Sequence, residues 1–238
     1  MRKVLAVLGI FLVFVGCVPA DLMAREDGIA NLYNSTVVLI DDSNAPVCSG
    51  FFISDTEVLT AAHCVQRISV SIVDSEIVIA PRSPIGTTQR IVSYHQYLLD
   101  NELGINSVFE VVEYDERRDL ALLRLQDGES LNYQPHVVRI YSHSYSPPVG
   151  SSTYVTGHPA GILFTFTRGM ISRQPLEYED IFYICSTTPV YHGNSGSPLF
   201  NNEGLVIGMT HAIVNRQSYL GMYTSYVEIN AFLTEIRS

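Results

Sequence analysis

Short runs of apolar residues, some alternating with polar ones, follow one another along most of the chain and are separated by residues that favour turns. These runs cover residues 37–40, 50–53, 57–60, 69–73, 76–80, 108–114, 120–125, 153–156, 181–185 and 205–210. Many short strands at this spacing predict a β-sandwich or a β-barrel. Because strands do not alternate regularly with helices, a parallel α/β fold is disfavoured.

The last segment of the chain has a different pattern. Four apolar residues recur at the spacing of one helical face, namely Ile229, Phe232, Leu233 and Ile236. This periodicity predicts a helix over residues 226–237, docked on the all-β body. Ser225, three residues before Glu228, is expected to start that helix with a capping box.

Three stretches show neither pattern. Residues 21–34 are interpreted as a connector to a domain that begins at residue 35. Residues 81–106 are irregular and predict a long loop. Prolines and polar residues cluster within residues 129–150, so a boundary between two halves is expected there.

The first twenty residues have the features of an export signal. Arg2 and Lys3 precede an apolar run over residues 4–15, which is too short to span a bilayer comfortably but fits a signal-peptide core. Small residues end the stretch 18–20 and would allow cleavage after it.

Cys17 offers a second processing route. Residues 15–17 resemble a bacterial lipobox, although Phe14 stands where leucine is usual, and lipidation would make Cys17 an anchored N-terminus. A signal-anchor helix is a third alternative. All three routes place the domain outside the cytoplasm, either free or attached to a membrane.

The composition argues for a folded domain that does not bind nucleic acid. Of the 238 residues, 47% are hydrophobic, which is enough for a sizeable core and argues against a disordered chain. The formal net charge is −10, and Lys3 is the only lysine. An acidic surface repels phosphate backbones, so nucleic acid is excluded as a partner.

The cysteines fit an oxidising compartment. With Cys17 in the signal region, Cys48 and Cys64 flank a short hairpin-like stretch and would be able to pair there. Cys185 is then left without a mate and is expected to be a buried thiol.

The stretch Gly193-Asn194-Ser195-Gly196-Ser197-Pro198-Leu199 is the strongest candidate for chemistry. Glycines around a serine allow backbone conformations that other residues resist, so the turn can expose the Ser195 hydroxyl. The backbone N–H groups of Gly193 and Ser195 would then hold the negative oxygen of a tetrahedral intermediate. The alternative is an ordinary turn rich in glycine, serine and asparagine.

Two further stretches supply partners for such a serine. His63 follows an apolar strand and small residues, and a neutral imidazole can take the serine proton and return it to a leaving amine. Asp119 opens an apolar strand, where a buried carboxylate needs a hydrogen-bond donor such as a histidine N–H. Alone, His63 could be a structural histidine and Asp119 a turn residue.

The order His63, Asp119, Ser195 and the residues around each resemble the chymotrypsin-like serine peptidases, over residues 37–236. The resemblance implies an all-β fold of two antiparallel six-stranded β-barrels, over about residues 35–130 and 145–225, with a C-terminal α-helix. It also implies hydrolysis of peptide bonds in proteins or peptides through an acyl-enzyme. A Cys48–Cys64 bridge would match the disulfide that trypsins place beside their histidine.

Several segments are most similar to two branches of that clan. Residues 157–161, read Gly-His-Pro-Ala-Gly, resemble the Gly-Asn-Pro-x-Gly pattern of HtrA-type enzymes, as do residues 167–172 and 208–213. The motif around Ser195 is more like that of the glutamyl endopeptidases, and residues 221–224 with the final helix are similar to the end of trypsins. No PDZ-like stretch follows the final helix, so a peptidase domain without the full HtrA arrangement is expected.

Asn194 departs from trypsins, which carry aspartate before the serine and pair it with a freshly cut N-terminal amine. An amide cannot form that ion pair, and no Ile-Val-Gly-Gly start is present. We therefore expect activity that does not depend on a liberated N-terminus.

Specificity is inferred from the same resemblance. Pro189 aligns with the acid of trypsins, so a pocket that selects basic residues is disfavoured. Val190, Ile213 and Gly221 align with pocket walls and predict cleavage after small or medium aliphatic residues. The alternative is glutamate selectivity through His211, but His211 is displaced by one residue from the position that glutamyl endopeptidases use, and strand residues alternate faces.

The other histidines are not expected to take part in the chemistry itself. His192 neighbours the oxyanion loop and is a candidate substrate contact, whereas His158 is expected in a turn that could approach the cleft. His95, His136 and His143 are interpreted as surface or loop residues. No Cys, His and acid cluster has metal-ligand spacing, so neither zinc catalysis nor another cofactor is predicted, although the excess of acid leaves calcium open.

Two rival functions stay open at this point. One is a binding protein that kept the fold and lost activity, which is disfavoured because all three candidate residues are present. The other is an esterase, which is disfavoured because the α/β-hydrolase motif Gly-x-Ser-x-Gly and the order Ser, Asp, His are absent. The sequence carries no signal for an oligomeric state.

Overall fold

The structure, a computed structural model, describes residues 26–41, 44–66, 70–73, 76–79, 88–93, 107–214 and 219–238. The segment interpreted as a signal peptide, residues 1–20 with Cys17, lies outside the described residues, as do His95 and most of the stretch 81–106.

The first barrel is closed and antiparallel, with the strand order β1-β2-β3-β8-β7-β6. Its strands are β1 (Thr36–Ile40), β2 (Pro46–Phe52), β3 (Glu57–Thr60), β6 (Thr88–Ser93), β7 (Ser107–Asp115) and β8 (Leu120–Leu125). A short helix, α2 (Ala62–Val65), follows β3 directly. Two further strands, β4 (Val70–Val73) and β5 (Glu76–Ile79), pair with each other as a separate two-stranded sheet.

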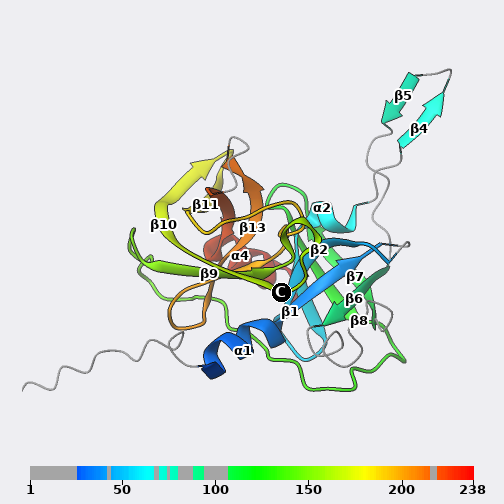
Figure 1. The fold of residues 1–238 in the computed structure, drawn as a ribbon, viewed down its shortest axis with the longest axis horizontal. Helices are drawn as coiled ribbons and strands as arrows, with labels where there is room; N and C mark the ends of the chain where they lie inside the picture. The colour runs from blue at the N-terminus through cyan, green and yellow to red at the C-terminus, as the bar shows by residue number, and fades with distance from the viewer. Residues whose placement is uncertain are drawn as a thin grey trace, which may run out of the picture.

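The second barrel is also closed, with the order β10-β11-β14-β13-β12-β9. Its strands are β9 (Ser152–Gly157), β10 (Thr165–Tyr178), β11 (Ile181–Ser186), β12 (Pro198–Phe200), β13 (Val206–Ile213) and β14 (Gly221–Ser225). A 3-10 turn, η2 (Pro159–Gly161), follows β9, and the helix α4 (Tyr226–Arg237) follows β14. Figure 1 shows the two barrels side by side. The prediction of two six-stranded barrels with a C-terminal helix is therefore confirmed.

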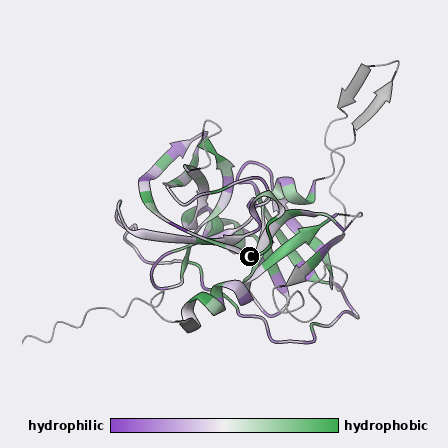
Figure 2. Ribbon diagram, viewed as in Figure 1, coloured by the Kyte–Doolittle hydropathy of each residue, from purple (hydrophilic) through white to green (hydrophobic). Residues whose placement is uncertain are grey.

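The apolar residues fill each barrel and the space between them. One cluster of buried residues lies inside the first barrel and another inside the second. A third cluster joins strands of both barrels to the two helices, through residues such as Leu32, Phe51, Phe200 and Phe232. Figure 2 shows apolar residues along the strands of both barrels and on α1 (Glu26–Ser35). Burial of apolar side chains across the junction holds the two barrels together, at roughly 25 cal/mol per Å² of apolar area.

The connector predicted over residues 21–34 is wrong for its second half, because residues 26–35 form the helix α1. Leu32 is buried in the cluster shared by both barrels, and the Thr36 hydroxyl donates to its carbonyl oxygen at 2.8 Å. The segment is therefore part of the packed domain. Among the residues of α1 whose burial is described, only Gly28 and Leu32 are buried before Ser35, so the helix contacts the core through few residues.

The capping box at the start of α4 is also wrong. Ser225 is at the N-cap position, but its hydroxyl makes no capping hydrogen bond. Glu228 instead accepts from the Phe182 backbone N–H at 3.1 Å and pairs with Arg118 at 3.2 Å. The Glu228 side chain, which a capping box would bond to the backbone of Ser225, is therefore bonded to residues of other elements.

The apolar runs predicted from the sequence do not include β6 of the first barrel or β10, β12 and β14 of the second. The long loop predicted over residues 81–106 is wrong for residues 88–93, which form β6. The longest, β10, is mostly exposed or half-buried and lacks apolar alternation. Among the described residues, no helix combines the length and the apolar character needed to cross a bilayer.

Candidate active site

Asp119 sits at the start of β8, where the turn from β7 ends. It adopts a left-handed backbone conformation with φ 57°, a region that aspartate and asparagine tolerate better than most residues. Its side chain accepts three hydrogen bonds. The backbone N–H of His63 donates at 3.0 Å, His63 Nδ1 at 2.8 Å and His211 Nδ1 at 2.8 Å, the last two to the same oxygen, Oδ2.

These bonds decide the charge of the buried carboxylate. Only 5% of Asp119 is exposed, and burial alone would raise its pKa by disfavouring the charged form. Hydrogen bonds from His211 and His63 outweigh the burial and hold the pKa of Asp119 well below its usual range. The carboxylate is therefore charged at every pH at which the protein would work.

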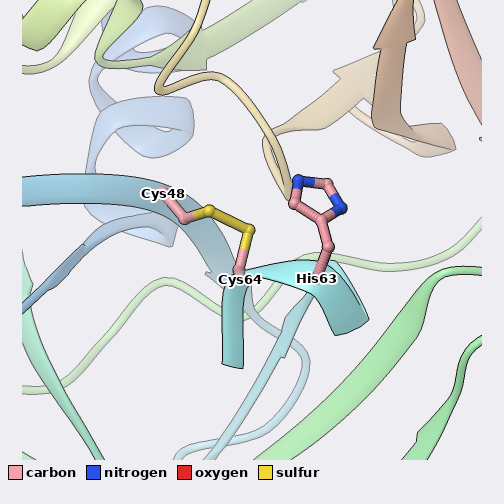
Figure 3. Close-up of side chains that lie close together, drawn as sticks. All are labelled: Cys48, His63 and Cys64. Carbon is pink, nitrogen blue, oxygen red and sulfur yellow. A yellow bond between two sulfur atoms is a disulfide. The ribbon is translucent and has the colours of Figure 1, made fainter. Parts of the chain in front are cut away.

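His63 lies in α2, beside the predicted disulfide. The Cys48–Cys64 bridge is present, with a Cα–Cα distance of 5.9 Å, and it ties α2 to β2. Figure 3 shows the bridge and the His63 imidazole leaving the short helix in different directions. Cys48, His63 and Cys64 offer possible ligand atoms within 4.8 Å of one another, but the two sulfurs are bonded together, so this group has no thiolate to give a metal. Cys185 is a free, buried thiol, as expected.

Ser195 lies in a tight loop whose carbonyl and N–H groups are mostly paired. The Asn194 N–H donates to Tyr191 O at 3.0 Å and the Ser197 N–H to Asn194 O at 2.8 Å, so two turns follow one another. Gly193 has φ 99°, which a residue with a side chain rarely adopts. Among the described residues, the N–H groups of Gly193 and Ser195 have no acceptor, which leaves both free for a ligand oxygen.

His63 and Ser195 line the same cleft, of about 580 Å³. Within the described part of the chain no hydrogen bond joins the Ser195 hydroxyl to the imidazole, whose Nδ1 is held by Asp119. A nucleophile and its base are often loosely paired before substrate binds. The structure thus brings all three predicted residues to one place, with the Asp119–His63 pair already formed.

Four of the six predicted substrate contacts are on the cleft wall: Val190, His192, His211 and Ile213. Tyr191, Thr210 and Ala212 complete the lining and were not predicted.

Pro189 and Gly221 do not line the cleft. Pro189 is exposed to solvent, and its carbonyl accepts from the Thr167 hydroxyl at 3.2 Å. At Gly221, an added Cβ would come within 2.8 Å of the buried Tyr223 ring, so the glycine makes room for that ring. Neither residue is among those that line the cleft, and both substrate contacts stay predictions.

His211 lines the cleft but is hydrogen-bonded to Asp119, through Nδ1 at 2.8 Å. The pairing of β13 with β14 shifts between Thr210 and Ala212, a bulge that lets His211 face Asp119. Its ring also lies 5.3 Å from that of Tyr183. The predicted displacement by one residue is consistent with this different orientation, but the bond to Asp119 was not foreseen.

Arg118, next to Asp119, ties this turn to the C-terminal helix. Its guanidinium contacts Glu228 at 3.2 Å and Glu235 at 2.6 Å, and the Thr224 hydroxyl donates to its carbonyl at 3.0 Å. The hydrogen bonds that Arg118 donates to Glu235, together with the charges of Glu235, Asp115 and Glu228, raise the pKa of Arg118 despite its partial burial. The turn that carries Asp119 is therefore fixed from the second barrel.

Comparison with known proteins gives one family and a set of relatives. Residues 48–209 match the family model described as a trypsin-like peptidase domain. The chain is 31% identical over 162 residues to a "Probable periplasmic serine endoprotease DegP-like" of Pseudomonas fluorescens, a match that covers 57% of this chain and 33% of that protein. A protein of the same name in Chlamydia trachomatis is 31% identical over 120 residues, covering 48% of this chain and 22% of the relative. The matches thus span about a third of these relatives or less.

Solved structures agree on the fold. The active form of the Mycobacterium tuberculosis protease Rv3671c has a TM-score of 0.63 at 21% identity, over 87% of this chain and 83% of that one. The serine endoprotease from Yersinia pestis has a TM-score of 0.61 at 20% identity, over 87% of this chain and 66% of that one.

Proposed function

Because the chain belongs to the trypsin-like peptidase domain family, we propose that it is a serine endopeptidase that cleaves proteins or peptides through an acyl-enzyme on Ser195. The observation that carries this proposal is the site itself. A charged Asp119 accepts a hydrogen bond from His63 Nδ1, and His63 and Ser195 line one cleft. The N–H groups of Ser195 and of Gly193, two residues before it, have no acceptor among the described residues.

Each residue has one chemical task in this proposal. Asp119 fixes His63 with its proton on Nδ1, which leaves Nε2 free to take the Ser195 proton as the hydroxyl oxygen attacks the peptide carbonyl. The N–H groups of Gly193 and Ser195 stabilise the resulting oxyanion. His63 then gives its proton to the leaving amine, and a water molecule, activated in the same way, hydrolyses the acyl-enzyme and restores Ser195.

Replacement of the nucleophile tests this assignment. Ser195→Ala is expected to lower kcat on casein about a million-fold without changing the free energy of unfolding by more than about 1 kcal/mol. A fluorophosphonate probe should label the parent and leave the variant unlabelled. A parent that is folded but neither cleaves nor reacts would favour the rival, an inactive binding protein.

We further propose cleavage after small or medium aliphatic residues. Val190, Ala212 and Ile213 supply apolar walls, and the described residues that line the cleft include no acid that would select a basic side chain. Behind these walls, Val190 and Ile213 pack in the buried cluster that contains the Tyr223 ring.

Glutamate selectivity is the competing outcome. His211 is held by Asp119, which argues against a role in binding a substrate carboxylate. Digestion of a peptide library by the purified protein separates the two possibilities. Most cuts after alanine, valine or similar residues would support the aliphatic pocket, whereas most cuts after glutamate would contradict it.

We also propose that activity does not require a liberated N-terminus. The Asn194 side chain is buried, at 1% exposure, and carries no charge that a terminal amine would pair with. Proteins that start at residues 17, 21 and 26 are therefore expected to have equal kcat. A sharp rise in activity on trimming between residues 21 and 37 would show that this is wrong.

The N-terminal segment leads us to propose export, with Cys17 as a lipid-anchored alternative to cleavage after Ala20. The names of the DegP-like relatives, which are described as periplasmic, support a location outside the cytoplasm. Mass spectrometry of the mature N-terminus distinguishes a diacylglyceryl Cys17 from a free Asp21 and from an intact anchor.

A further inference from the structure

The turn after β9 and a serine of the first barrel both bind the loop that forms the oxyanion hole. The Ala160 N–H donates to His192 O at 2.8 Å, and the Ser49 hydroxyl donates to Gly193 O at 2.9 Å. In a trans peptide the carbonyl and the following N–H point in opposite directions. The bond from Ala160 to His192 O therefore turns the Gly193 N–H away from the β9 turn, and this N–H is one of the two left without an acceptor in the described structure.

Ser49 is held in turn by His158. The hydroxyl has one proton, which goes to Gly193 O, so its second contact, to His158 Nδ1 at 2.8 Å, is a bond that it accepts. Both side chains are fully buried. Burial lowers the pKa of His158 to about 4, so the imidazole is neutral and carries its proton on Nδ1. A chain of two hydrogen bonds thus runs from His158 through Ser49 to the carbonyl of Gly193.

The loop around Gly193 packs directly against His158. A Cβ added at Gly193 would come within 2.4 Å of His158 O, so close approach is possible only for glycine. Ser49 also donates its backbone N–H to Ser195 O at 2.8 Å, so one residue of β2 binds both sides of the loop.

Asn194 does not share this task. Its amide is buried, and no hydrogen bond to its side chain exists among the described residues. The position that an ion pair would fill in a trypsin therefore supplies no side-chain bond to hold the loop here, and the bonds from Ser49 and from the turn 157–161 remain.

From this arrangement we infer that Ser49 and His158 are positioning residues for the oxyanion hole. They hold the Gly193–Asn194 peptide through its carbonyl, and this fixes Gly193 beside the His192–Gly193 peptide, whose N–H would face the scissile carbonyl. The inference rests on the proposed peptidase function. Neither residue would touch substrate, so their effect should be confined to the transition state, where charge builds up on the oxygen.

Two substitutions remove one of the hydrogen bonds that link His158, Ser49 and the Gly193 carbonyl, and a third keeps both bonds. Ser49→Ala removes the donor to Gly193 O, and His158→Leu removes the donor to Ser49. Each is expected to lower kcat about tenfold with KM unchanged, which is less than the hundredfold or more lost when an oxyanion donor is deleted outright. His158→Asn places an amide N–H near the position of Nδ1 and should restore kcat to within about threefold of the parent.

A peptide aldehyde provides a second measurement, because the oxygen of its adduct with Ser195 occupies the oxyanion hole. Its inhibition constant should rise by the same factor as kcat falls in Ser49→Ala, and stay at the parent value in His158→Asn. Ser35→Ala is the matched control, since it deletes another fully buried hydroxyl that donates to a backbone carbonyl, that of Leu32 at 2.8 Å, and should leave kcat and the inhibition constant unchanged.

The outcomes separate the two proposals. Parental kcat in a folded Ser49→Ala, or a loss that appears in KM and not in kcat, would overturn the inference while the peptidase function stands. A folded parent that neither turns over peptides nor reacts with a fluorophosphonate would overturn the function itself. If His158→Leu fails to fold, Ser49→Ala, which removes a single oxygen, decides the question.

Discussion

The two ends of the proposed catalytic cleft are held in place by different kinds of interaction. At the carboxylate end, a charged Asp119 accepts bonds from His63 and His211. The neighbouring Arg118 is paired with acids of α4. Every charge buried there has a hydrogen-bond partner, which is the condition under which buried charge is tolerated.

At the oxyanion end, the buried groups are neutral and only partly satisfied. His158 Nε2, both polar atoms of the Asn194 amide and Ser197 Oγ have no partner among the described residues. Unpaired buried polar atoms of this kind cost about 1–3 kcal/mol each. From this comparison we expect that removing a charge at the carboxylate end lowers activity, and that adding a charge at the oxyanion end lowers the stability of the fold.

Removal of the charge at Asp119 tests the first half of this contrast and has the largest expected effect. Asp119→Asn should lower kcat about ten-thousand-fold, because an amide offers His63 a donor as readily as an acceptor and no longer fixes the tautomer. The fold should survive, which urea unfolding would verify. A loss smaller than about tenfold in a folded variant would mean that the carboxylate has no part in the chemistry.

Addition of a charge at His158 tests the second half. The pKa of His158 is lowered to about 4 in the folded protein by burial, against 6.5 when unperturbed. Above pH 6.5 neither state binds the proton. Between pH 6.5 and 4 the unfolded chain takes it up and the folded protein does not, so stability falls by about 3 kcal/mol over this window as the pH drops.

The variant His158→Asn isolates this contribution from other groups that titrate in acid. The free energy of unfolding of parent minus variant, measured in urea from pH 7.5 to pH 4, should decrease by about 3 kcal/mol across that range. A difference that does not change with pH would show that His158 has the same pKa in the folded and unfolded states, as an accessible imidazole would.

The ion pairs of Arg118 offer a matched pair of substitutions at the carboxylate end. Glu228 is buried and Glu235 is exposed, yet both contact the same guanidinium. Glu228→Gln should cost about 2 kcal/mol of stability, because a buried partner loses its charge while Arg118 keeps two other acids. Glu235→Gln should cost less than Glu228→Gln, since solvent screens the exposed pair. Equal losses in urea unfolding would contradict this ranking.

The predictions from sequence succeed where the signal is local. Most of the barrel strands show as short apolar runs, the final helix shows its 3.6-residue period, and the flanks of His63 and Ser195 are compact motifs. Residues that act through tertiary contacts carry no such signal. Ser49 and His158 are 109 residues apart and meet only because the barrels pack together. The Gly-His-Pro-x-Gly turn was noticed, but nothing local shows that its histidine points inward.

The differences between prediction and structure have physical causes of the same kind. Alignment of a loop with a known family assigns Pro189 and Gly221 to a pocket, yet it does not say which side chains of the loop face inward. The helix α1 was missed because its stability comes from contacts such as that of Leu32 with the shared core, and not from its own apolar pattern. The strand β10 was missed because much of it faces solvent.

The smallest expected effect concerns His211, the second imidazole on Asp119. Loss of its donated bond in His211→Leu should raise the pKa of Asp119 and loosen the carboxylate, while the two bonds from His63 remain. We expect kcat to fall about tenfold, which corresponds to about 1.4 kcal/mol and to the lower end for a hydrogen bond to a charged group. His211→Asn keeps an N–H in nearly the same place and should stay within about threefold of the parent. If both variants change KM alike and leave kcat unchanged, His211 serves the wall of the cleft and not the carboxylate, and the charge at this end is held by His63 alone.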